Sequence, residues 1–105
     1  MSKDRARELL EFLRRIPHGK VVTYGMLAKK FDLNPRYVGM ILSRNDKPDY
    51  YPCYKVVRSD LTVGGYTISH ENNRRTKDEK VKRLKKDGVI LKEGKIEKSA
   101  LYRLR

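Results

Sequence analysis

Apolar positions in the first third of the chain repeat at the three- and four-residue spacing of a helix. Between residues 4 and 16 this spacing places them on one face, which predicts an amphipathic helix. Pro17 and Gly19 end the pattern. The apolar positions of the predicted helix are Leu9, Leu10, Phe12, Leu13 and Ile16.

Two shorter helical patterns follow, separated by a tight turn. Val21 and Val22 form an apolar link, and Thr23 is then a suitable N-cap for a helix that carries Leu27, Ala28 and Phe31. Residues 32–33 make the turn. Asn34 is a second N-cap and Pro35 suits the first helical position, so a third helix is expected to reach about Ser43. Two helices around so short a turn predict a helix-turn-helix.

The second half of the chain has weaker periodicity. Residues 44–51 read as a loop; Tyr54, Val56 and Val57 read as a short strand that Gly64 and Gly65 end. Residues 68–75 lack any period and predict a surface loop. Thr76 and Glu79 have the spacing of a capping box for a fourth helix that ends at Gly88. Residues 89–96 resemble a hairpin, with its turn at Glu93-Gly94.

These elements predict one fold class: mainly α with small β elements, a winged-helix-like helix-turn-helix DNA-binding domain. The hairpin would be the wing. We expect residues 1–105 to form a single domain, since 105 residues suit one compact core.

The charge of the chain points to a polyanionic partner. Lys and Arg number 26 against 13 Asp and Glu, for a net charge of +13. Such an excess holds nucleic acid by counterion release. A solvated lysine surface, as in heat-adapted proteins, is the alternative. No apolar run approaches the ~20 residues of a membrane span, and the N-terminus has no signal-peptide core, so we expect no membrane association and a cytoplasmic or, in a eukaryote, nuclear location.

Cys53 is the single cysteine of the chain. One cysteine excludes an internal disulfide framework and a multi-cysteine zinc site. His18 and His70 are far apart in sequence and have no partner ligands, so we expect no metal. The cysteine is then either an inert buried thiol or a reactive one.

Four segments, taken together and in order, resemble a known family. They are residues 16–25 (IPHGKVVTYG), 35–39 (PRYVG), 52–57 (PCYKVV) and 64–66 (GGY). The chain is similar in them to the C-terminal domain of O6-alkylguanine-DNA alkyltransferases. We expect the family's separate N-terminal domain to be absent, as it is in the smaller alkyltransferase-like proteins. Those relatives bind alkylated DNA and characteristically lack the reactive cysteine.

The resemblance implies that Cys53 takes an alkyl group from a flipped guanine in one irreversible turnover, without cofactor or metal. Most of the family has a histidine directly after the cysteine. This histidine relays a proton and is supported by a carboxylate. Tyr54 and Asp87 stand at these two positions. A tyrosine, with a pKa near ~10, is a poor base. We therefore expect slower transfer, unless Lys55 or the environment of the third helix lowers the pKa of the thiol. Alternatively, Tyr54 only packs on the domain and Asp87 is a surface charge.

The resemblance also implies a base pocket formed by Tyr24, Val56, Tyr66 and Thr67. Tyr24 would donate its hydroxyl to the guanine as negative charge develops, and the Thr67 backbone amide would face O6. Asn45 matches an asparagine that connects the helix-turn-helix to the active-site loop by backbone hydrogen bonds.

Arg36 matches the family's arginine finger, which fills the base stack after extrusion. The further candidate DNA contacts are Thr23, Asn34, Tyr37 and Gly39. Gly39 inside a helix allows either a close DNA backbone or close helix packing. The loop at residues 69–75 either admits bulky adducts or grips phosphates. A set of lysines on the fourth helix is expected to form a solvated face: Lys80, Lys82, Lys85 and Lys86.

Three functions fit these observations. The first is repair of O6-alkylguanine by alkyl transfer to Cys53. The second is a non-catalytic sensor that binds and flips the lesion, and the third is a winged-helix transcription factor. The expected partner is double-stranded DNA containing O6-alkylguanine, with repair proteins as candidate further partners and the chain itself as a monomer.

Overall fold

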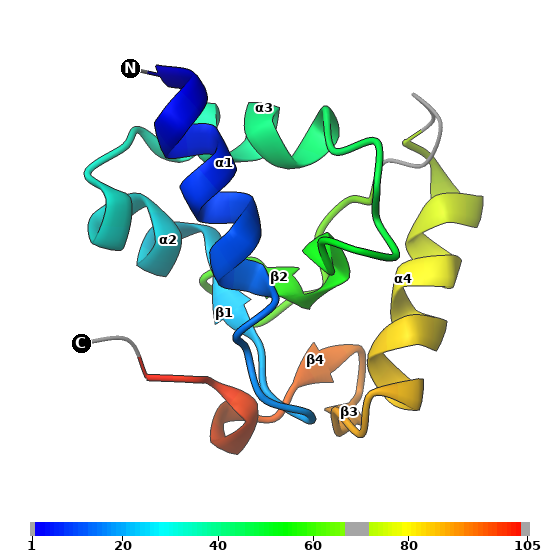
Figure 1. Cartoon of the computed structure of the whole chain (residues 1–105). Coiled ribbons are helices and arrows are strands. Elements are labelled where there is room, and N and C mark those ends of the chain that lie inside the picture. Colours follow the sequence, from blue (N-terminus) through cyan, green and yellow to red (C-terminus); the bar gives the residue numbers. More distant parts are fainter. Residues whose placement is uncertain (1, 67–71, 104–105) are drawn as a thin grey trace.

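The computed structural model describes residues 2–66 and 72–103, with the side chains of residues 2–4 left out. Within these residues the chain forms four α-helices, two small sheets and two 3-10 turns (Figure 1). None of the described helices is long and apolar enough to cross a membrane. In chain order the elements are α1 (Ser2–Leu13), β1 (Val22–Thr23), α2 (Tyr24–Phe31), α3 (Pro35–Ser43), η1 (Cys53–Lys55), β2 (Val56–Val57), α4 (Arg74–Lys86), β3 (Leu91–Lys92), β4 (Lys95–Ile96) and η2 (Lys98–Ala100).

Helix α1 crosses the front of the molecule in Figure 1 and buries Leu9 and Leu13 completely. It ends at Leu13, three residues before the predicted end at Ile16. The Arg14 and Arg15 amides instead donate to carbonyls three residues back, at 3.1 and 2.9 Å. Such tighter bonds commonly close a helix end. Ile16 remains buried beyond the helix and still serves the core.

The helix-turn-helix is confirmed in α2 and α3, and its caps are those the sequence predicts. The Thr23 hydroxyl accepts from the Met26 amide at 3.0 Å. The Asn34 side chain accepts from the Arg36 amide at 2.8 Å. Asp32 adopts a left-handed conformation, with φ of 53°, and turns the chain between the helices. These local bonds set where α3 begins and which way it points.

Strand β1 pairs with β2 in parallel, in the register Val22↔Val56 and Thr23↔Val57. The sequence predicted only an apolar link at Val21-Val22, because a strand of two residues has no periodicity to detect. The predicted start of β2 at Tyr54 is also wrong, since Tyr54 lies in η1. This pairing brings the start of α2 beside η1, although the two are far apart in sequence.

Helix α4 begins at Arg74, so the predicted capping box at Thr76 and Glu79 is wrong. Asn73 is the N-cap: its side chain accepts from the Thr76 amide at 3.2 Å, and its amide donates to the Thr76 hydroxyl at 2.9 Å. Asn is a stronger N-cap than Thr, which explains the earlier start. The last two residues of the predicted loop thus belong to the helix, and residues 67–71 lie outside the described residues.

The predicted hairpin is confirmed in β3 and β4, which pair antiparallel. Glu93 and Gly94 form its turn with φ of 54° and 78°, as a two-residue turn of this type requires. The hairpin packs on a small core with α4 and β2. A larger core lies between α1, α2 and α3 and includes Cys53 and Tyr66.

Candidate functional site

A cavity of about 560 Å³ opens beside Cys53, within the usual ~300–1,000 Å³ of ligand pockets. Its walls come from the start of α2, the exposed end and flank of α3, η1, and the chain around Gly65. The lining residues are Tyr24, Pro35, Arg36, Gly39, Leu42, Ser43, Cys53, Arg58, Gly65, Tyr66 and Asn72. The Cys53 side chain therefore lines a space of the size a nucleobase requires.

Cys53 begins η1 and is only 6% exposed, so its sulfur is reached through the cavity. Its amide donates to the Tyr51 carbonyl at 2.7 Å, which holds the start of the turn. Burial raises the pKa of the thiol, and the Asn45 hydrogen bond and the charges of Lys80 and Arg83 oppose that rise. The free protein therefore holds a thiol at neutral pH unless a base lies beside it.

Asn45 connects α3 to the loop that leads to Cys53. Its side-chain amide donates to the Tyr51 carbonyl at 2.9 Å, and its side-chain oxygen accepts from the Lys47 amide at 3.0 Å. These two bonds hold the backbone near the start of the loop, at Lys47, and near its end, at Tyr51. Asn45 is thus placed to fix the loop that carries the cysteine.

Tyr54 and Asp87 lie together, but on the other side of η1 from the Cys53 cavity. The Tyr54 hydroxyl donates to the Asp87 carboxylate at 3.3 Å. Both residues line a separate cavity of about 610 Å³ with Pro52 and Arg83. Burial, followed by the Asp87 charge, raises the pKa of Tyr54 to about 12. A phenol so hard to ionise cannot serve as the base for a thiol at neutral pH.

Asp87 is a largely buried ion-pair partner, so its interpretation as a surface charge is wrong. Its carboxylate lies 2.9 Å from Lys55 Nζ and accepts from the Gly19 amide at 3.0 Å. Burial opposes ionisation, but the bonds from Lys55 and Gly19 prevail and lower the pKa of Asp87. The Asp87 side chain thus connects three parts of the chain: the end of α4, the turn that follows α1, and η1.

Lys55 does not lie beside the thiol, contrary to the role the sequence allowed it. It is 3% exposed and donates to the carbonyls of Ile16 and Pro17 at 3.2 and 2.8 Å. Its third partner is Asp87. The three donors of the ammonium are therefore occupied in a structural role.

Lys80 is a buried lysine whose amine binds the backbone of the cavity wall at Gly65, a placement that sequence reasoning missed. It is 1% exposed, so the prediction that it belongs to a solvated face is wrong; Lys82, Lys85 and Lys86 are exposed as predicted. Its Nζ donates to the carbonyls of Val56 and Gly65 at 2.6 and 3.1 Å. The available signal was spacing, because Thr76, Lys80 and Leu84 form a buried stripe at intervals of four residues.

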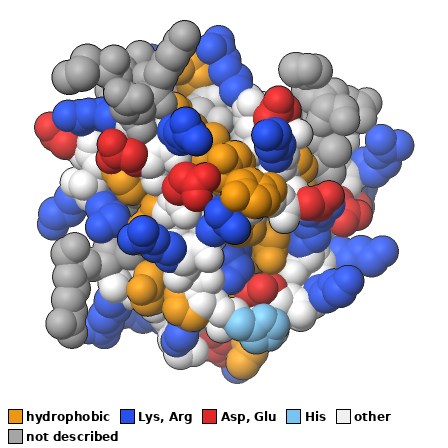
Figure 2. Space-filling view, viewed as in Figure 1, with side chains coloured by type: hydrophobic (Ala, Val, Ile, Leu, Met, Phe, Trp, Pro, Cys, Tyr) orange, Lys and Arg blue, Asp and Glu red, His pale blue; other side chains and the backbone are white. Residues whose placement is uncertain are grey.

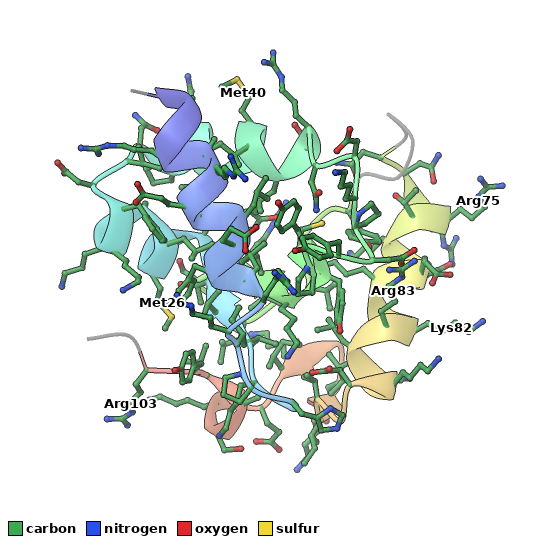
Figure 3. The ribbon with its side chains drawn as sticks, in the orientation of Figure 1. Met26, Met40, Arg75, Lys82, Arg83 and Arg103 are labelled. Atoms are coloured by element: carbon green, nitrogen blue, oxygen red, sulfur yellow. The ribbon has the colours of Figure 1, made fainter. Side chains whose placement is uncertain are left out.

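Figure 3 shows how neighbouring side chains of α4 diverge. Lys82 points away from the helix, whereas Arg83 lies toward the loop before η1, where it pairs with Asp49 at 2.8 Å and with Glu79 at 3.2 Å. The Arg83 guanidinium also lies 6.0 Å from the centre of the Tyr66 ring. Arg83 thus links the loop before η1 to α4 and lies close to the Tyr66 ring.

Two tyrosines form walls of the cavity. Burial, with the nearby Cys53, raises the pKa of Tyr24 and raises that of Tyr66 to about 12. Tyr66 is 3% exposed and its hydroxyl has no hydrogen-bond partner among the described residues. Val56 does not line the cavity, contrary to prediction, because its side chain is fully buried in the core. Thr67 lies outside the described residues.

The mouth of the cavity lies on α3. Arg36 is exposed at the first turn of this helix and lines the opening. A Cβ added at Gly39 would meet nothing within 4 Å, which excludes close helix packing as its explanation. Among the other predicted DNA contacts, Asn34 is exposed and Tyr37 packs partly on the core. Thr23 is buried with its hydroxyl capping α2, so its side chain serves the helix and not an outer surface.

Basic side chains are distributed over the surface of the molecule (Figure 2). Figure 2 shows Lys and Arg side chains spread over the face that carries α1, with fewer acidic groups between them. His18 lies 3.4 Å from Asp87 and is largely exposed. The described residues contain no cluster of three His, Cys, Asp or Glu side chains that could hold a metal ion.

The chain matches one protein-family model and several curated proteins. Residues 4–89 match the family model described as the DNA binding domain of 6-O-methylguanine DNA methyltransferase. The chain is 41% identical over 98 residues to a bifunctional methyltransferase/endonuclease of Picrophilus torridus, covering 91% of this chain and 30% of that protein. It is 46% identical over 69 residues to a methylated-DNA–protein-cysteine methyltransferase of Methanopyrus kandleri, covering 66% and 52%. The chain thus spans only 30% and 52% of the lengths of these relatives.

Two solved structures share the fold. S. pombe Atl1, in a complex with damaged DNA containing O6-carboxymethylguanine, matches over 97% of both chains with a TM-score of 0.78 and 21% identity. The O6-methylguanine-DNA methyltransferase of Pyrococcus kodakaraensis matches over 80% of this chain and 46% of its own, with a TM-score of 0.66 and 33% identity. These likenesses confirm the predicted fold class.

Proposed function

Because the chain belongs to the family defined by the DNA-binding domain of 6-O-methylguanine DNA methyltransferase, we propose that it repairs DNA by moving an alkyl group from guanine O6 to Cys53. The observation that carries this proposal is the thiol of Cys53 at the wall of a base-sized cavity. The methyltransferase names of its relatives support the same chemistry. The comparisons do not favour a winged-helix transcription factor.

The reaction is a displacement at the alkyl carbon. The Cys53 thiolate attacks that carbon, a C–S bond forms, and the C–O6 bond breaks with its electron pair passing to the guanine. Tyr24, on the cavity wall, is placed to donate its hydroxyl to the ring as this charge develops. The thioether that results is stable, so each molecule acts once.

Binding of the duplex uses α3 and the charge of the chain. The proposed finger, Arg36, stands at the mouth of the cavity, where it can occupy the space of the extruded base. Gly39 leaves open space on the same helix face for the DNA backbone. The net charge of +13 supplies affinity that does not depend on base sequence.

Intact-mass analysis after incubation with a duplex containing O6-methylguanine tests the proposal. We expect the protein to gain the mass of one methyl group on the peptide that contains Cys53, and never more than one. The Cys53→Ala variant, with the same duplex, is the matched control and gains nothing. An unmodified wild-type protein that is fully bound to the duplex contradicts alkyl transfer.

The alternative is a damage sensor, which the Tyr54 position and the raised pKa of the Cys53 thiol support. A sensor binds the alkylated duplex more tightly than the unmodified one, keeps that preference in Cys53→Ala, and transfers nothing. Fluorescence anisotropy on the two duplexes, combined with the mass measurement, separates the two functions.

We propose that the chain acts as a monomer. We also propose that alkylated guanines which it does not repair are passed to other repair proteins. The name of the Picrophilus relative joins a methyltransferase to an endonuclease, which supports an endonuclease as the candidate partner. Size-exclusion chromatography with light scattering on the duplex complex tests the monomer.

A further inference from the structure

We propose that the molecule has a docking site for an acidic, partly apolar peptide segment of a partner protein. The site is a cavity of about 770 Å³ between α1, α2 and the chain around η2. We call it the basic cavity after its four cationic lining residues, which are Lys20, Lys30, Lys98 and Arg103. This inference goes beyond the proposed alkyl transfer and does not depend on it.

Helix α2 separates the basic cavity from the cavity beside Cys53. Tyr24 lines the Cys53 cavity, whereas Met26, two residues later, lines the basic cavity. Residues two positions apart in a helix point to nearly opposite sides. The two cavities share no described lining residue, and Figure 3 shows Met26 well separated from Met40 of α3. A partner can therefore occupy the basic cavity while a duplex lies on α3.

The charge of the basic cavity is not balanced within the molecule. None of its described lining residues is acidic, and none of its four cations forms an ion pair with a described side chain. By contrast, the cavity beside Tyr54 includes Asp49, Glu79 and Asp87 among its lining residues. The basic cavity lacks such a counter-charge, and carboxylates of a partner would supply it.

Backbone hydrogen bonds hold one wall of the basic cavity in place. The Val21 amide donates to the Ala100 carbonyl, and the Tyr102 amide donates to the Val21 carbonyl, both at 2.8 Å. Lys20 Nζ donates to the Ser99 carbonyl at 2.7 Å. The chain around η2 is thereby fixed beside the start of β1. A preformed wall reduces the entropy that a partner must lose on binding.

Most of the remaining lining is apolar. It consists of four half-buried side chains, which are Phe12, Met26, Leu101 and Tyr102. Further burial of such side chains is favourable when the partner contributes apolar surface of its own. Phosphate groups contribute none. A peptide with both carboxylates and apolar side chains matches the two parts of the lining.

Two other occupants fit this lining less well. Single-stranded nucleic acid uses aromatic rings that are free to stack on bases. Lys30 Nζ lies 5.1 Å from the centre of the Phe12 ring, and Phe31 packs edge-to-face with that ring at 5.9 Å between centres. Tyr102 packs partly on the larger core. A second copy of the chain has the same net charge of +13 and is repelled.

Fluorescence anisotropy with a labelled peptide tests the site on the full chain. The probe is a glutamate-rich peptide with a central leucine-phenylalanine pair. We expect it to bind the wild type, and the double variant Lys98→Glu/Arg103→Glu to bind it at least about tenfold more weakly. The matched control, Lys92→Glu/Lys95→Glu, makes the same charge change at exposed positions of the hairpin and should lower the affinity less than about twofold. No binding to the wild type, or equal losses in the two variants, overturns the proposal.

Two further probes distinguish the kind of partner. A peptide of equal charge that contains only glutamate should bind about tenfold more weakly, because it buries no apolar side chain; equal affinity overturns the proposal. Affinity for a single-stranded oligonucleotide should fall by similar factors in the two double variants, since total charge governs it. A selective loss in Lys98→Glu/Arg103→Glu would identify a nucleic-acid site instead and overturn the proposal.

A last measurement uses the wild-type protein, so it does not depend on the folding of a variant. Nuclear magnetic resonance of isotope-labelled methionine methyl groups compares Met26, in the basic cavity, with Met40 on α3. The peptide should shift the Met26 signal and leave that of Met40 unchanged; a shift confined to Met40 overturns the proposal. Failure of methyl transfer from DNA with these peptide results intact would contradict the proposed function and leave the docking site standing.

Discussion

Two adjacent residues of η1 lie in two differently built polar clusters. On one side Cys53 lines a cavity, and the buried Lys80 binds the uncharged carbonyls of Val56 and Gly65, the second of which belongs to the cavity wall. On the other side Tyr54 meets Asp87, whose charge is matched by Lys55. A buried cation without a carboxylate has a low pKa and can exchange a proton, whereas a paired cation keeps its charge. The first cluster therefore suits chemistry, and the second suits structure.

Removal of the Asp87 carboxylate should have the largest effect on the difference between the two clusters. Asp87→Ala leaves Lys55 buried without its counter-charge, which should lower the free energy of unfolding by about 3 kcal/mol. Urea denaturation measures the loss, with the exposed Asp46→Ala as the control at less than about 0.5 kcal/mol. At a temperature where Asp87→Ala is folded, the pH profile of Cys53 alkylation by iodoacetamide should stay as in the wild type. A shifted profile would mean that the second cluster takes part in thiol ionisation.

The pH dependence of stability sharpens the contrast on the Lys80 side. The pKa of Lys80 is about 7 in the folded protein and about 10.4 in the unfolded chain, so the unfolded state binds more protons between these values. Stability should therefore rise with pH, by about 1.5 kcal/mol between about pH 7 and 8.5. Below about pH 6 the group is protonated in both states and contributes no slope.

Chemical denaturation at several pH values measures this rise in the wild type and in Lys80→Met, where the slope should vanish. The window ends near pH 8.5, the ordinary pKa of a cysteine, because above it the raised pKa of the Cys53 thiol acts increasingly in the opposite direction. An equal slope in the two proteins would show that Lys80 keeps its proton throughout.

The smallest expected effect concerns the mouth of the Cys53 cavity. Gly39→Ala should stabilise the free protein by up to ~1 kcal/mol, because alanine favours the helix and its Cβ would meet no atom within 4 Å. The same methyl group projects toward the proposed path of the DNA and should weaken binding of the alkylated duplex. Denaturation and anisotropy give the two quantities. Unchanged affinity would remove Gly39 from the proposed interface.

Local signals predicted the helix-turn-helix and the hairpin, because caps at Thr23 and Asn34 and the turn at Glu93-Gly94 act within a few residues. The two clusters depend on contacts across the chain. Lys80 meets a carbonyl 24 residues away, and Asp87 meets an amide 68 residues away. A long polar side chain carries no local mark of whether its end lies in solvent or against a distant carbonyl. The placements of Lys55, Lys80 and Asp87 therefore required the structure.

The same limit applies to the cavity wall. Resemblance placed Cys53, Tyr24 and Tyr66 in one site, and all three line one cavity. The resemblance also included Val56 in the pocket, but its side chain is fully buried in the core, and its carbonyl accepts from Lys80. Proximity along a turn does not determine which side a residue faces.

The Tyr66 hydroxyl has a consequence for the unbound protein. Among residues 2–66 and 72–103 this buried hydroxyl has no hydrogen-bond partner, and a buried hydroxyl without a partner costs about 1–3 kcal/mol. A guest molecule that supplies a partner to this oxygen removes that cost, and its binding is linked to folding. The melting temperature should thus report occupancy, even for a free O6-alkylated purine that is not attached to a duplex.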